Sequence, residues 1–398
     1  MPSRHPASIE PFVPRTVLHV ATERGWRGGE RQVLWLARAL EAMGHRSVVV
    51  ARGGEPLAER AREAGLEVVS LAPRTEFDPI AVALLRRAAL RYDADVVHAH
   101  TGHAVGLAAL ARVGARARMV VTRRVDFALK RNVASRWKYR RADAIIAISH
   151  AVADIMVAGG VHRSRITIVP SGIDLTRQIV PAAPEVLESL GVPRGAPVVV
   201  QVAQLVGHKD PVNFVRGLAA ARRRVPSLHG LMLGEGPLRG EVEAEATRLG
   251  VRDALHLPGY RTDADSILAA ATVATLSSRE EGLGTVLLDA LSLGRPVAAC
   301  AAGGIPEIIE DGTSGLLVPR ENGDALGAAI ARLIEDPALA ARLGEGARHR
   351  AVEFSVERTA ARTLEVYERV LGGWRAPVSE SADASADASA DAAAAEPA

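Results

Sequence analysis

Short runs of β-branched and other apolar residues alternate with longer helical patterns along almost the whole chain. Such runs suit strands that are buried on both faces, as in a parallel sheet covered by helices. The alternation of strand and helix patterns therefore predicts an α/β fold. The predicted strands are 16–22, 46–50, 67–71, 95–100, 119–122, 144–149 and 166–170 in the first half, and 197–202, 230–234, 255–258, 273–276, 296–300 and 315–319 in the second.

The length of 398 residues exceeds that of one ordinary domain. A stretch rich in proline and glycine at 181–197 predicts a boundary between a Rossmann-like domain at 16–180 and a second one at 195–355. Ligands are expected in the cleft between them, at the carboxyl ends of the strands. Residues 1–15 contain no apolar core of a signal peptide, and we expect a flexible N-terminus. No run approaches 18 apolar residues, so we expect a cytoplasmic protein.

The segment 377–398 repeats Ser-Ala-Asp-Ala and carries five acidic residues with no lysine or arginine. It offers no aromatic or β-branched residue after Val378 with which to bury a core. We therefore expect a disordered tail with no catalytic role.

Basic residues gather in the segment Arg123–Arg141, where Asp126 is the lone acid. One interpretation is a solvated helix face. The other is contact with anionic lipid headgroups or with a phosphorylated acceptor. Nucleic acid is disfavoured because aromatic residues make up only 3% of the chain. The basic residues are Arg123, Arg124, Lys130, Arg131, Arg136, Lys138, Arg140 and Arg141.

The most specific motif lies at 278–297, where Glu281 and Asp289 stand eight positions apart. Between them the turn Gly282-Leu283-Gly284 opens a helix. Glycine permits positive φ and close approach of a ligand, and a helix start presents free N–H groups to phosphate. An ordinary strand–turn–helix connection is the alternative. With carboxylates on both sides for sugar hydroxyls, the motif predicts a nucleotide-sugar site.

This segment resembles the Glu-x7-Glu signature of the retaining GT-B glycosyltransferases of glycosyltransferase family 4, with Asp289 replacing the second Glu. The resemblance extends over about 16–371. It implies the GT-B fold, two Rossmann-like domains facing across a cleft, with the last helix at about 356–371 crossing back to the first domain. It also implies metal-independent transfer, with retention, from a nucleotide-diphosphate sugar to a glycan or lipid-linked acceptor. Envelope polysaccharide or lipopolysaccharide biosynthesis, at the inner face of the membrane, is the expected setting, with no cofactor besides the donor.

Two further loops resemble the family. The glycine-rich turn with Gly28 and Gly29 is similar to its Gly-Gly-x-Glu region, which faces the donor phosphates. The loop 202–210 is similar to its Gly-Arg-Leu-x-x-x-Lys-Gly, in which Arg and Lys hold the diphosphate. Lys209 matches the lysine, but Gln204 brings no charge where the family has Arg, and His208 or a first-domain arginine is the candidate substitute.

The resemblance assigns Glu281 to the sugar hydroxyls, Lys209 to the developing diphosphate charge and Asp289 to the ribose. The first two are the predicted catalytic residues. The predicted donor-binding residues are Gly28, Gly29, Gln204, Tyr260, Arg261, Gly282, Gly284, Thr285 and Asp289.

For the acceptor, Arg124 occupies the histidine position of the family's Thr-x-His and could bind phosphate or carboxylate. Asp126 would then be an acceptor-binding or base-like group. His98, His100 and His103 invite a metal interpretation, since two of the three could meet one ion, but no cysteine or carboxylate completes a set. We favour pocket-lining histidines, with His100 near the acceptor.

Two Asp-x-Asp sequences, at 93–95 and 263–265, mimic a metal motif of the other glycosyltransferase fold. The first precedes a strand and the second suits a helix cap. We treat both as accidental and predict no metal site.

Two alternatives belong to other classes. A sugar-nucleotide epimerase on the same fold would need no acceptor. A non-catalytic relative that binds nucleotide sugars is suggested by Gln204 and Asp289, which depart from the family pattern. The sequence does not identify the sugar, the base or the acceptor.

Overall fold

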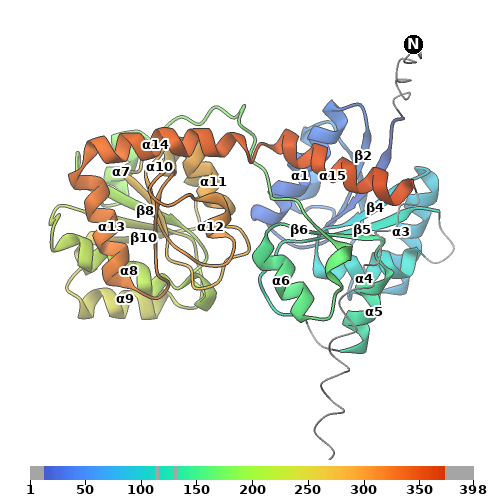
Figure 1. Cartoon of the computed structure of the whole chain (residues 1–398), viewed down its shortest axis with the longest axis horizontal. Helices are drawn as coiled ribbons and strands as arrows, with labels where there is room; N and C mark the ends of the chain where they lie inside the picture. Colours follow the sequence, from blue (N-terminus) through green and yellow to red (C-terminus); the bar gives the residue numbers. More distant parts are fainter. Residues whose placement is uncertain (1–12, 113–115, 130–131, 373–398) are drawn as a thin grey trace, which may run out of the picture.

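The computed structural model describes residues 13–112, 116–129 and 132–372. They form two parallel sheets, each covered by helices and lying side by side in Figure 1. The first sheet has the order β3-β2-β1-β4-β5-β6-β7 and the second the order β10-β9-β8-β11-β12-β13. The two-domain α/β prediction is therefore confirmed. The tail at 377–398 and residues 1–12 lie outside the described part.

Every predicted strand region holds a strand of the structure. The strands are β1 (Thr16–Val20), β2 (Arg46–Ala51), β3 (Glu67–Ser70), β4 (Val96–Ala99), β5 (Arg118–Arg123), β6 (Ala144–Ala147), β7 (Ile166–Ile168), β8 (Val198–Val202), β9 (His229–Leu233), β10 (Leu255–Gly259), β11 (Val273–Leu276), β12 (Val297–Cys300) and β13 (Leu316–Val318). Their neighbours pair in parallel throughout.

Helices connect the strands and cover both sheets. They are α1 (Gly28–Ala42), α2 (Pro56–Glu63), α3 (Pro79–Arg91), α4 (Gly102–Ala111), α5 (Val133–Arg141), α6 (His150–Ala158), α7 (Pro184–Ser189), α8 (Pro211–Arg222), α9 (Arg239–Arg248), α10 (Ala264–Ala270), α11 (Thr285–Ser292), α12 (Ile305–Ile308), α13 (Gly323–Glu335), α14 (Pro337–Val352) and α15 (Val356–Leu371). Among these described helices, none is long and apolar enough to cross a membrane.

The strand order reverses at the same place in both sheets. The chain builds outward from β1 to β3 and returns to place β4 on the other side of β1. It repeats this path from β8 to β10 and back to β11. The loops that leave the carboxyl ends of such neighbouring strands diverge and open a crevice, which is where ligands bind in folds of this kind.

The last helix, α15, returns to the first domain and packs beside α1 (Figure 1). Its Val366 and Tyr367 are fully buried in one apolar cluster with Val17, Leu40 and Val96. Burying a side chain of this size contributes on the order of 1.5–3 kcal/mol, so α15 is part of the core of the first domain.

Candidate active site

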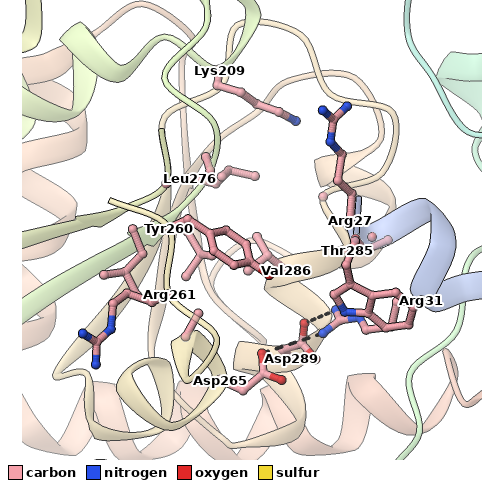
Figure 2. Close-up of a pocket in the computed structure, with 18 of the residues that line it drawn as sticks. Arg27, Arg31, Lys209, Tyr260, Arg261, Asp265, Leu276, Thr285, Val286 and Asp289 are labelled. Atoms are coloured by element: carbon pink, nitrogen blue, oxygen red, sulfur yellow. Dashed lines mark hydrogen bonds and ion pairs between the residues drawn. The ribbon is translucent and has the colours of Figure 1, made fainter. Parts of the chain in front are cut away.

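A cavity of about 290 Å³ lies between the two domains and is lined by loops at both crevices. The first domain contributes the loop after β1 and the start of α1, including Trp26, Arg27 and Arg31 (Figure 2). The second contributes the loops after β8, β10 and β11. The cavity therefore joins the carboxyl ends of both sheets.

Two helix N-termini meet at this cavity. Gly28, the first residue of α1, lies so close to the start of α11 that a Cβ on it would be 3.2 Å from Thr285 Oγ1. The N-cap of α11 is Gly284, which has a φ of +84° and leaves the first amides of the helix without a side-chain cap. The positive ends of both helices thus face one space, an arrangement that favours an anion.

Glu281 and Lys209 form the central ion pair of the cavity. Lys209 Nζ lies 2.5 Å from Glu281 Oε2, and Ser278 Oγ donates to the same oxygen over 3.2 Å. Ser277 Oγ donates to the carbonyl oxygen of Lys209 over 3.1 Å, so the loop after β8 and the loop after β11 are tied together. Each charged group is held in place and already neutralised by the other.

Asp289 lies at the floor of the cavity and is only 1% exposed. Arg31 donates to its carboxylate over 2.5 Å and Arg177 over 3.1 Å. Burial raises the pKa of Asp289, and the charge of Arg31 opposes that rise. Both guanidinium groups lie over the ring of Trp35, at 4.7 Å for Arg31 and 5.4 Å for Arg177. The predicted ribose carboxylate is therefore engaged by two arginines, one of them on α1.

Asp265 completes this network, because it pairs with Arg31 and Arg177 as well. The predicted helix cap at 263–265 is confirmed in its position alone. Asp263 occupies the N-cap position of α10, but no side chain caps that helix, and Asp263 pairs with Arg261 instead, at 2.7 Å.

Arg27 is the cation that sequence reasoning did not place. Its guanidinium points into the cavity on the side where Lys209 ends (Figure 2). Among the residues that the structure describes, no carboxylate lies within ion-pair distance of it, whereas Lys209, Arg31 and Arg261 are paired. Arg27 is the N-cap of α1 and has an extended backbone with a φ of −133°, so helix periodicity could not have placed its side chain.

Both predicted catalytic residues, Lys209 and Glu281, line the cavity, and so do six of the predicted donor-binding residues: Gly28, Tyr260, Arg261, Gly284, Thr285 and Asp289. Gly29, Gln204 and Gly282 do not, and Gln204 is exposed. A Cβ on Gly282 would lie 2.8 Å from the carbonyl oxygen of Arg124, so this glycine allows the two domains to touch. Ser149 Oγ donates to the carbonyl oxygen of Gly282 over 2.6 Å and strengthens the same contact.

The predicted acceptor residues lie outside this cavity. Arg124 donates to His100 Nδ1 over 2.9 Å, and burial lowers the Arg124 pKa to about 10. Asp126 lines a second cavity, on the far side of Glu281.

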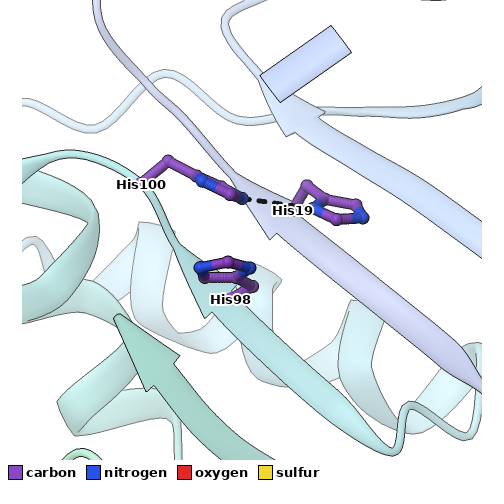
Figure 3. Close-up of side chains that lie close together, drawn as sticks. All are labelled: His19, His98 and His100. Carbon is purple, nitrogen blue, oxygen red and sulfur yellow. Dashed lines mark hydrogen bonds between the residues drawn. The ribbon is translucent and has the colours of Figure 1, made fainter. Parts of the chain in front are cut away.

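The histidine cluster has a different membership from the predicted one. His19 of β1, not His103, joins His98 and His100 (Figure 3). Every ring nitrogen has a polar neighbour within 3.3 Å. His19 contacts His100 and Ser47, His98 contacts Tyr367 and Thr122, and His100 contacts Arg124 as well as His19.

Burial lowers the pKa of all three rings, that of His19 to about 3, and the cation of Arg124 adds to this effect. The rings are therefore neutral. Because each nitrogen is already bonded and a guanidinium stands beside them, the set does not fit a metal ion.

Residues 183–350 match the family described as Glycosyl transferases group 1, and residues 26–177 match Glycosyltransferase Family 4. The chain is 32% identical over 225 residues to a D-inositol 3-phosphate glycosyltransferase of Saccharomonospora viridis, covering 54% of this chain and 52% of the relative. It is 29% identical over 322 residues to a GDP-mannose-dependent alpha-(1-6)-phosphatidylinositol monomannoside mannosyltransferase of Mycolicibacterium smegmatis, covering 76% and 84%. The chain spans about half the length of the first of these relatives.

Solved structures share the fold. The Anabaena protein HepE in complex with UDP and glucose superposes with a TM-score of 0.77 at 22% identity, covering 88% of this chain and 99% of that one. A glycosyltransferase from Rickettsia africae superposes with a TM-score of 0.75 at 19% identity, covering 90% and 99%.

Proposed function

Because the chain belongs to the group 1 glycosyltransferases of family 4, a retaining, nucleotide-sugar-dependent family, we propose that it transfers a sugar from a nucleotide-diphosphate sugar to a glycan or lipid-linked acceptor. The observation that carries the proposal is the ion pair of Glu281 with Lys209, at a cavity where two helix N-termini meet. An ordinary domain boundary does not require a half-buried cation, a carboxylate and two positive helix ends in one place.

The diphosphate would lie between the starts of α1 and α11, with Lys209 and Arg27 as its cations. Binding it would draw Lys209 away from Glu281 and free that carboxylate to accept hydrogen bonds from sugar hydroxyls. As the bond from the anomeric carbon to the diphosphate breaks, negative charge grows on the leaving oxygen, where Lys209, Arg27 and both helix ends stabilise it. Arg27 would supply the charge that Gln204 lacks.

In the transfer itself, the acceptor oxygen forms a bond to the anomeric carbon and the diphosphate leaves. The proton of the acceptor hydroxyl passes to the departing diphosphate oxygen. Attack on the same face from which the diphosphate leaves accounts for retention. Tyr260 and Arg261 would flank the base, and the ribose would approach Asp289 in competition with Arg31 and Arg177.

The names of relatives point to the setting. Similar structures include a lipopolysaccharide outer core galactosyltransferase and a second glycosyltransferase of lipopolysaccharide biosynthesis. Together with the mannosyltransferase that acts on a phosphatidylinositol monomannoside, they support a role in envelope glycan synthesis at the inner face of the membrane.

Calorimetric titration of UDP, GDP and ADP into the wild type and Lys209→Ala tests the donor site. We expect one nucleotide to bind at micromolar strength, roughly −8 kcal/mol, and the substitution to weaken it at least tenfold. The matched control is Arg24→Ala, which removes an exposed cation of the β1–α1 loop that does not line the cavity. Absence of binding by all three nucleotides would overturn the proposal.

A second candidate is a non-catalytic binder of nucleotide sugars, favoured by Gln204 in place of the family's arginine and by the engagement of Asp289 with two arginines. Nucleotide binding without turnover of any sugar donor, with turnover appearing after Gln204→Arg or Asp289→Glu, would favour this candidate. An epimerase would instead change the donor sugar with no acceptor present.

A further inference from the structure

A cavity of about 660 Å³ adjoins the donor cavity on the other side of Glu281. One wall comes from the second domain and includes Arg279 and Arg320. The other wall is largely apolar and comes from the loop 126–129 and from α6. Among the described residues that line these two cavities, Glu281 is the one common to both. A donor sugar held by Glu281 would therefore face this second cavity.

Asp126 is the polar group that this cavity leaves unsatisfied. Its Oδ2 is buried and has no hydrogen-bond partner among the described residues. A buried carboxylate oxygen without a donor costs on the order of 1–3 kcal/mol or more. A hydroxyl of a bound molecule would remove that cost, so the cavity suits a hydroxyl-bearing ligand.

A third cavity, of about 380 Å³, adjoins the second one. Both are lined by Leu129 and Gly159, which are packed so tightly that a Cβ on the glycine would lie 2.8 Å from the leucine side chain. The far side of this third cavity is basic, with Arg136 and Arg140 of α5 and Arg165. The three cavities thus run in a row from the donor site, past Glu281, to the end of α5.

The arginines of the third cavity form no ion pairs with described residues, whereas basic residues near them do. Lys138 on the same helix pairs with Glu76 at 2.5 Å, and Arg112 pairs with Asp143 at 2.7 Å. Arg136, Arg140 and Arg165 form no ion pair with any residue that the structure describes.

Arg165 is the most enclosed of these arginines, and within the described part of the chain its guanidinium donates only to the carbonyl oxygens of Arg140 and Ala142. Burial lowers its pKa, and the like charges of Arg112 and Arg140 add to that effect while Asp143 opposes it. An enclosed cation among like charges favours an anion from outside the protein.

We propose that the acceptor carries a phosphate group, which binds Arg136, Arg140 and Arg165, while its reactive hydroxyl lies between Asp126 and Glu281. This inference rests on the proposed function and names the class of acceptor. One guanidinium group can donate two parallel hydrogen bonds to two oxygens of a phosphate. Three guanidinium groups around one concave cavity suit a single phosphate group better than they suit a flat anionic surface. The apolar wall beside α6 would cover the carbon skeleton between the two polar ends.

The test measures ligand binding by the double variant Arg136→Ala/Arg140→Ala in the presence of saturating UDP. Both side chains are exposed and form no hydrogen bond with any residue that the structure describes, so the fold is expected to persist. The control is Arg86→Ala/Arg87→Ala, which removes two exposed arginines of α3. The soluble probe is glycerol 3-phosphate, and the lipid probes are phosphatidylcholine vesicles that contain phosphatidic acid or, at equal charge, phosphatidylserine.

Binding of glycerol 3-phosphate that weakens at least tenfold in the double variant, and not in the control, would support the proposal with a soluble phosphate ester. Selective binding of phosphatidic acid vesicles, lost in the same variant, would support it with a lipid-borne phosphate. Three outcomes would overturn it: binding of none of the probes, equal binding to both kinds of vesicle without binding of glycerol 3-phosphate, and no effect of the substitution on any probe that binds. UDP affinity is measured on the same proteins, and the affinity of the double variant should stay within twofold of that of the wild type. A failure of the donor site would instead appear as a loss of UDP binding.

Discussion

The two domains share a topology and place a buried polar residue at the same points of it. The fourth residue of the first strand is His19 in β1 and Gln201 in β8. The third residue of the strand beside it is His98 in β4 and Thr275 in β11. The second domain therefore uses polar groups that cannot ionise where the first domain uses histidines.

The buried polar residues of the two domains also hold different parts of the structure in place. Gln201 accepts a hydrogen bond from the amide of Ser277 over 2.9 Å and so holds the loop that leads to Glu281. His98 instead contacts Tyr367 of α15 over 2.6 Å and is one of the rings packed near Arg124. The second domain therefore supports the loop that leads to Glu281 with an amide that does not ionise, whereas the first domain depends on histidines that stay neutral.

The largest expected effect is acid destabilisation of the first domain. Three of its buried histidines, His19, His98 and His100, have folded pKa values below the unfolded value of about 6.5, that of His19 at about 3. Their contribution is present above pH 6.5 and is lost as the pH falls below it, because the unfolded chain then binds more protons. Together they remove about 6 kcal/mol between pH 8 and pH 5.

Urea unfolding at several pH values measures this loss. His19→Gln places in β1 the residue type that β8 has at the same point, and it should reduce the loss of unfolding free energy between pH 8 and pH 5 by about 2 kcal/mol. The exposed His103→Gln is the control and should leave it unchanged. A pH profile that His19→Gln does not alter would contradict the comparison.

The next effect tests the second domain. Glu281→Gln keeps the shape of the side chain but removes the charge that would hold the donor sugar. We expect turnover, measured as release of UDP from the donor, to fall about 10²- to 10³-fold, or roughly 3–4 kcal/mol. UDP affinity should stay level or rise, because Lys209 is released. Turnover equal to that of the control Glu241→Gln, on the exposed face of α9, would refute the assignment.

A smaller effect concerns Arg27 of the first domain, which we propose supplies the positive charge that Gln204 of the second domain lacks. Arg27→Ala should weaken UDP binding about tenfold to 150-fold, since a charge-assisted hydrogen bond contributes about 1.5–3 kcal/mol. Gln204→Arg in the same protein should restore most of that affinity by returning the cation to the second domain. Failure of the second substitution to rescue the first would show that the two positions do not serve one phosphate.

The smallest effect lies at the contact between the domains. Ser149→Ala removes both the hydrogen bond to Gly282 and the N-cap bond to the amide of Val152. We expect a loss of about 1 kcal/mol, seen in calorimetry as a Tm lower by a few degrees. Asn132→Ala removes a comparable cap from α5 with no bond across the cleft. The Tm increase on adding UDP should shrink for Ser149→Ala alone.

The fold could be predicted because strands buried on both faces leave continuous apolar runs, and each of those runs became a strand. The signature could also place Glu281, Gly284 and Thr285, since a strand–turn–helix unit is local. The partners of those residues were harder to find. Arg31 and Asp289 are 258 positions apart, and their ion pair depends on how two domains meet.

The histidine cluster shows the same limit. His103 is close to His98 in sequence, but the residue beside His98 in space is His19. The reason is that β1 and β4 pair with His19 opposite His98. Only the strand order reveals that adjacency, and no local pattern encodes the strand order.

The return of α15 has a consequence for how the protein is made and divided. Tyr367 and Val366 complete a core whose members outside α15 are spread over the first domain, from Val17 to Val169, and Arg15 pairs with Glu368 at 2.6 Å. During synthesis the first domain therefore waits for the last helix, with the whole second domain emerging in between. A fragment that stops at the linker would expose an apolar groove and leave His98 without Tyr367, whereas a fragment that adds residues 356–371 through a short connection has every part of that core.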